Sequence, residues 1–117
     1  MKYLQFVFVM LMLVGGVKAQ QVPIDGVDAR SDPAEFAKQL NSPDALVRQR
    51  SAEALARLAA TDQRKLVEGY RLQEKNKDVR LALDWALYRM GRAEALYRIV
   101  DELDSGRQEQ AIGYLSE

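Results

Sequence analysis

DALVRQRSAEALARLA at 44–59 and DVRLALDWALYRMG at 78–91 are two copies of one pattern, and they decide the fold of this chain. An offset of 32 aligns Val47-Arg48 with Val79-Arg80, Ala54-Leu55 with Ala86-Leu87, and Ala59 with Gly91. Within each copy the apolar residues recur at the spacing of one helix face, and a polar break precedes each copy. Self-similarity at this period indicates repeated helical hairpins.

A third, less regular copy follows. An offset of 28 from Leu87 reaches Leu115 and places Ala111 on Leu83. The helices then pair as three hairpins, at 33–60, 62–91 and 92–117. Strand signals are absent, because β-branched residues are sparse and polar and apolar residues do not alternate. We therefore expect an all-α fold over 32–117, in which stacked hairpins share one core; an ordinary antiparallel helical bundle is the alternative.

The order of features in both copies resembles the HEAT-repeat family. An Asp-containing turn is followed by Val-Arg, then small residues, then Ala-Leu, as in the short bacterial repeats related to phycobilisome lyases. This resemblance implies a right-handed α-solenoid of about three hairpins. It also implies a structural ladder between neighbouring units, made by Asp44, Arg48, Asp78 and Arg80. The alternative role of these arginines is to bind an anion.

The first 19 residues have the organisation of a secretory signal peptide. Lys2 precedes an unbroken apolar run at 6–14, and Val17-Lys18-Ala19 offers small or aliphatic residues to a signal peptidase. The run is shorter than the roughly 18 apolar residues of a membrane span. We therefore predict a signal peptide at 1–19, an extended or disordered lead-in at 20–31, and a periplasmic or secreted protein without a stable membrane anchor after cleavage.

Composition restricts the chemistry. The chain has no Cys and no His, which excludes thiol catalysis, an imidazole base and most zinc sites. Removing Lys2 and Lys18 leaves 15 basic and 17 acidic residues, a net charge of −2, which disfavours nucleic-acid binding. We expect a non-enzymatic protein without a cofactor or metal. The resemblance to lyase repeats keeps an enzyme subunit as a weaker alternative.

The middle unit carries a stripe of large apolar residues opposite its expected core face, at Leu81, Trp85 and Tyr88. The equivalent positions of the outer units are polar or small, namely Gln49, Glu53 and Ala56, and Glu109, Gly113 and Ser116. Exposed apolar stripes with Trp and Tyr are typical of binding surfaces, and Arg89 and Arg92 would border this one. The alternative is that Trp85 packs against a neighbouring unit.

These expectations define an interaction module that binds a protein or peptide on the surface of its second helices. A second hypothesis is an assembly subunit that stacks through its terminal repeats, where Ile112 lies off the core face. The partner and the oligomeric state stay open. Phe36, Tyr70 and Tyr97, on the first helices of their hairpins, are expected to pack internally.

Overall fold

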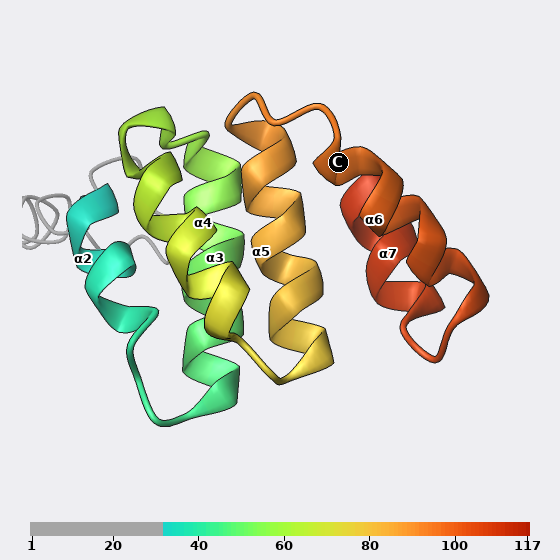
Figure 1. The fold of residues 1–117 in the computed structure, drawn as a ribbon, viewed down its shortest axis with the longest axis horizontal. Coiled ribbons are helices and arrows are strands. Elements are labelled where there is room, and N and C mark those ends of the chain that lie inside the picture. Colours follow the sequence, from blue (N-terminus) through green and yellow to red (C-terminus); the bar gives the residue numbers. More distant parts are fainter. Residues whose placement is uncertain (1–31) are drawn as a thin grey trace, which may run out of the picture.

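The computed structural model describes residues 32–117, so the expected signal peptide and lead-in lie outside the described residues. In the described part every regular element is helical and no strand is present. The elements are α2 (Pro33–Gln39), α3 (Ala45–Leu58), η1 (Thr61–Gln63), α4 (Arg64–Gln73), α5 (Lys77–Arg89), α6 (Ala95–Asp101), η2 (Glu102–Asp104) and α7 (Gln108–Leu115) (Figure 1). Among these helices none is both long and apolar enough to cross a membrane.

Helices α3 and α5 each begin at a side-chain cap. The Asp44 carboxylate accepts a hydrogen bond from the Leu46 backbone N–H at 2.9 Å at the start of α3. Asn76 lies 32 residues later and caps α5 in the same way, with bonds of 2.9 and 3.1 Å from Asp78 and Val79. Such caps satisfy N–H groups that have no partner inside the helix. The repeat therefore fixes where both long helices begin.

The same offset fixes where α3 and α5 end. Ala59, with φ of 48°, and Gly91, with φ of 103°, both have left-handed backbones. After α3 the Ala60 N–H donates to the Leu55 carbonyl at 3.2 Å, and after α5 the Arg92 N–H donates to the Leu87 carbonyl at 2.9 Å. Both ends therefore have the six-to-one bond of a Schellman motif, which stops the helix and turns the chain.

Helix α5 is the centre of the fold. It packs against α3, α4 and α6, and Figure 1 shows α4 in front of the α3–α5 pair with the α6–α7 hairpin beside α5. Buried side chains from all three hairpins form one hydrophobic cluster, which includes Leu55, Val67, Leu83 and Ile99. This continuous core accounts for the stability of hairpins that are each too short to fold alone.

The apolar stripe expected on the surface of α5 is largely buried. Leu81 and Trp85 are each only 2% exposed and belong to the core, so the expectation that they form an exposed stripe is wrong and the packing alternative holds. The physical reason is the position of α5, because neighbours surround the central helix. Trp85 packs against Tyr114 of α7. Tyr97, by contrast, was expected to pack internally and is 72% exposed.

Candidate functional site

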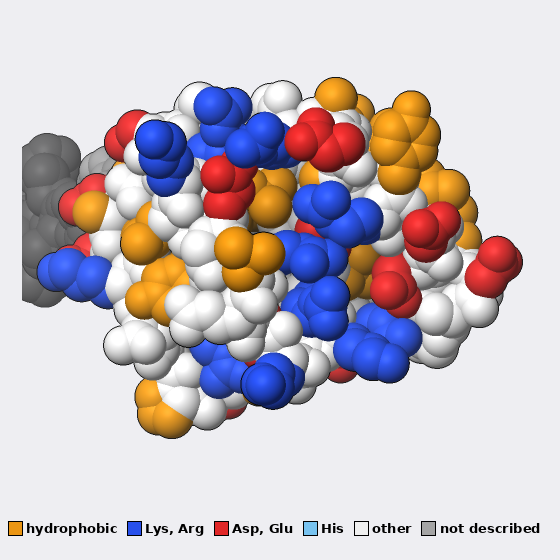
Figure 2. Space-filling view, viewed as in Figure 1, with side chains coloured by type: hydrophobic (Ala, Val, Ile, Leu, Met, Phe, Trp, Pro, Cys, Tyr) orange, Lys and Arg blue, Asp and Glu red, His pale blue; other side chains and the backbone are white. Residues whose placement is uncertain are grey.

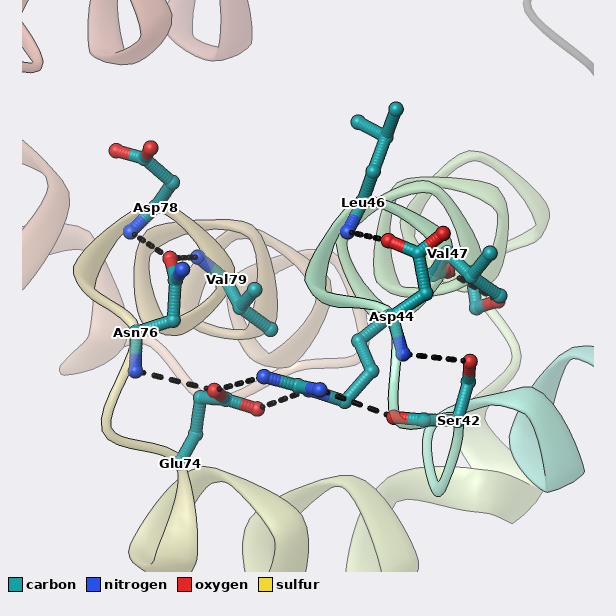
Figure 3. A network of polar contacts seen from close by, with 10 residues as sticks. Ser42, Asp44, Leu46, Val47, Glu74, Asn76, Asp78 and Val79 are labelled. Carbon is teal, nitrogen blue, oxygen red and sulfur yellow. Dashed lines mark hydrogen bonds and ion pairs between the residues drawn. The ribbon is translucent and has the colours of Figure 1, made fainter.

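Arg48 joins the first hairpin to the second. Its guanidinium donates two hydrogen bonds of 2.9 Å to the Glu74 carboxylate at the end of α4, and a third of 2.9 Å to the Ser42 carbonyl (Figure 3). Burial alone would raise the pKa of Glu74, but the bonds from Arg48 and from the Asn76 N–H lower it below its ordinary value. The bond to Glu74 raises the pKa of Arg48 in turn. This bidentate pair is a geometry in which guanidinium binds carboxylate strongly.

The predicted ladder of Asp44, Arg48, Asp78 and Arg80 is not formed, because Arg48 pairs with Glu74 and not with Asp44 or Asp78. The Asp44 side chain caps α3. Asp78 is exposed, and its backbone carbonyl accepts a hydrogen bond of 2.9 Å from the Gln110 side chain. The guanidinium of Arg80, the corresponding arginine of the second unit, makes no hydrogen bond or ion pair within residues 32–117. Arg48 thus forms an ion pair between the first two hairpins, whereas Arg80 has no side-chain partner in the described part of the chain.

Arg80 lines a hollow over α5, between α4 and α6. Two adjoining cavities of about 230 and 290 Å³ share Arg71 and Arg98 and together form what we call the basic trough. Its lining comprises Glu68, Arg71, Leu72, Lys77, Arg80, Leu81, Asp84, Leu87, Arg92, Arg98, Asp101, Glu102 and Arg107. Figure 2 shows a band of Lys and Arg side chains on this face of the molecule.

A buried carboxylate holds two of these arginines. Asp84, whose side chain is 5% exposed, accepts bonds from Arg71 at 2.8 and 3.2 Å and from Arg98 at 2.8 Å. One negative charge thus faces two positive charges, and the group keeps a surplus of one positive charge at the middle of the trough. Because Arg71 comes from α4 and Arg98 from α6, the same contact sets the positions of both walls.

The other residues predicted to bind a partner do not gather at one place. Tyr88 is partly exposed, and Arg89 reaches back to α3, where it donates to the Ala56 carbonyl at 3.3 Å. Arg92 pairs with Glu68 and lines the basic trough. Of the five predicted binding residues, Leu81 and Arg92 touch the trough, and Leu81 is buried in its floor.

Sequence reasoning missed the residues that build the trough, above all Arg71, Asp84 and Arg98. One signal was available, because Asp84 is the single acid within the apolar run LALDWAL of α5. An acid is rarely buried without a cationic partner. The partners themselves lie 13 and 14 residues away in other helices, and a helical wheel of α5 does not contain them.

The arrangement favours binding of an anion. No group of three or more acidic side chains in the described residues is arranged to hold a metal ion. The chain matches no family model, no curated protein and no solved structure. The case for function therefore rests on the repeat pattern and on the geometry of the basic trough.

Proposed function

We propose that this protein is an exported, non-enzymatic HEAT-like α-solenoid that binds a protein or peptide partner in its basic trough. The observation that carries the proposal is the placement of cations from α4, α5 and α6 around one hollow, with Asp84 holding two of them in place. Stacked helical hairpins commonly use extended surfaces of this kind to bind other chains. The site differs from the second-helix stripe that the sequence suggested.

The HEAT-like assignment is supported by the recurrence of local structure at an offset of 32. The helix caps at Asp44 and Asn76 correspond, as do the left-handed ends at Ala59 and Gly91. Export is supported by the sequence of residues 1–19 alone. Its test is the amino-terminal sequence of protein recovered from the cell envelope or the medium, which should begin at Gln20.

The partner is sought by chemical cross-linking in the source cells with tagged full-length protein. A Lys77→Glu/Arg80→Glu variant reverses two charges in the trough. An Arg50→Glu/Lys65→Glu variant makes the same change in net charge outside the trough, and circular dichroism checks that both variants fold. A protein captured by the parent and the control but lost by the trough variant supports the proposal. Equal capture by all three, or no captured protein, contradicts it.

A second candidate function, assembly through the terminal repeat, has one favourable observation. Tyr97, Val100, Ile112 and Leu115 on the last hairpin are all exposed. Exposed apolar residues at the end of a helical array can stack against another unit. Light scattering over a hundredfold range of concentration tests this function, because assembly predicts a rising mass that Ile112→Ser abolishes.

A further inference from the structure

One arginine of the repeat corresponds to Arg80 and binds a carboxylate. This counterpart, Arg48, lies 32 residues earlier, at the same place in the preceding second helix. Arg48 faces a hollow between the first two hairpins and holds a carboxylate there through two bonds of 2.9 Å. Arg80 faces the next hollow along the array. The chain itself is thus a precedent for a carboxylate at this site.

Two of the three carboxylates that line the cavity of Arg80, those of Glu102 and Asp84, are bound by other side chains. Glu102 accepts hydrogen bonds from the Ser105 hydroxyl and from the Arg107 guanidinium at 2.9 Å, and these bonds hold its pKa below the ordinary value. Asp84 is bound by two arginines. Among the side chains that line this cavity, Asp101 and Arg80 have no hydrogen bond or ion pair within the described residues, and Lys77 interacts with Glu102 through its charge alone.

We propose that Arg80 binds a carboxylate side chain from an acidic segment of the partner, in the relation that Glu74 has to Arg48. This inference rests on the function proposed above and specifies the chemistry of the partner. The guanidinium plane favours two parallel hydrogen bonds to a carboxylate, and Lys77 beside it adds a second positive charge.

The adjoining half of the trough determines what accompanies the carboxylate. Leu72 is 83% exposed there, and Leu87 lies in the floor. An apolar side chain of the partner would cover Leu72 and remove its surface from water. The expected ligand is therefore a peptide segment that carries an Asp or Glu and, near it, a large apolar residue.

The test uses isotope-labelled full-length protein and three probes. These are an octapeptide of alternating glutamate and leucine, the same peptide with glutamine in place of glutamate, and inorganic phosphate. Nuclear magnetic resonance follows the side-chain Nε–H signals of the arginines, and fluorescence anisotropy gives the dissociation constants. Each titration is repeated with Arg80→Gln and with Arg50→Gln, which removes one positive charge outside the trough.

We expect the glutamate peptide to shift the Arg80 Nε–H signal, and its affinity to fall about tenfold in Arg80→Gln but not in Arg50→Gln. The inference is overturned if the glutamine peptide binds equally well, if phosphate binds as tightly as the glutamate peptide, or if no peptide binds. The cross-linking experiment separates the two proposals. A trough-dependent partner whose binding segment is neutral would leave the proposed function in place and reject only the acidic ligand.

Discussion

The indole of Trp85 stacks on the phenol ring of Tyr114, with ring centroids 4.3 Å apart and planes inclined by 6°. The Arg57 guanidinium lies 5.1 Å from the centroid of the Trp85 ring and also binds the Glu117 carboxylate through bonds of 3.1 and 2.9 Å. Side chains from α3, α5 and the end of the chain therefore meet at one aromatic contact. This contact joins the last helix to the first two hairpins.

Replacing Tyr114 by alanine should loosen α7. We expect Tyr114→Ala to lower the free energy of unfolding by about 3 kcal/mol, because the buried ring and its stacking contact with Trp85 are both lost. Trp85 is the only tryptophan in the chain, so its emission should shift to longer wavelength. Urea unfolding followed by circular dichroism and fluorescence measures both effects. Tyr97→Ala, at an exposed position on α6, is the control and should change stability little.

The ion pair of Arg48 and Glu74 gives a pH-dependent prediction. Because the pKa of Glu74 is lowered on folding, its stabilisation is present above about pH 4.5 and is lost as pH falls through the lower folded value. We expect Glu74→Gln to be less stable than the parent at pH 7, by about 1–2 kcal/mol. The difference should shrink as the pH falls below about 4.5. Urea unfolding at half-unit steps of pH measures it, and a difference that grows on acidification would contradict the assignment.

The two left-handed helix ends make a matched pair of substitutions. Ala59→Gly should raise the free energy of unfolding by about 0.5–1 kcal/mol, because a left-handed backbone costs alanine more than the entropy that glycine adds. Gly91→Ala should lower it by about 1–2 kcal/mol, since φ of 103° is strained for any side chain. Thermal unfolding of the two variants and their double mutant measures the effects, which should be additive. A destabilised Ala59→Gly would contradict the repeat symmetry.

Features set by local sequence were predictable. The all-helical fold and the correspondence of Ala59 with Gly91 depend on spacing within the chain, and both are present. Contacts between hairpins were not predictable, because a helical wheel identifies one face of a helix but not the neighbour that covers that face. For that reason the sequence left open whether Trp85 is exposed or packed, and the structure shows it buried. The partner of Arg48 depended on a loop 26 residues away.

Asp84 gives the prediction that connects the fold to the trough. Asp84→Asn keeps the size of the side chain but removes the charge that binds Arg71 and Arg98. We expect a loss of about 2–3 kcal/mol in the free energy of unfolding, because two ion pairs with a buried charge are lost while both guanidiniums stay close together. The Arg71 and Arg98 Nε–H signals should broaden as the two side chains become mobile. Asp101→Asn, an exposed acid at the edge of the trough, is the matched control and should leave both signals and the stability unchanged. If Asp84→Asn instead kept the two arginine signals sharp, Asp84 would not be the residue that holds the trough in shape, and the positions of its walls would have to come from the packing of α4 and α6 on α5 alone.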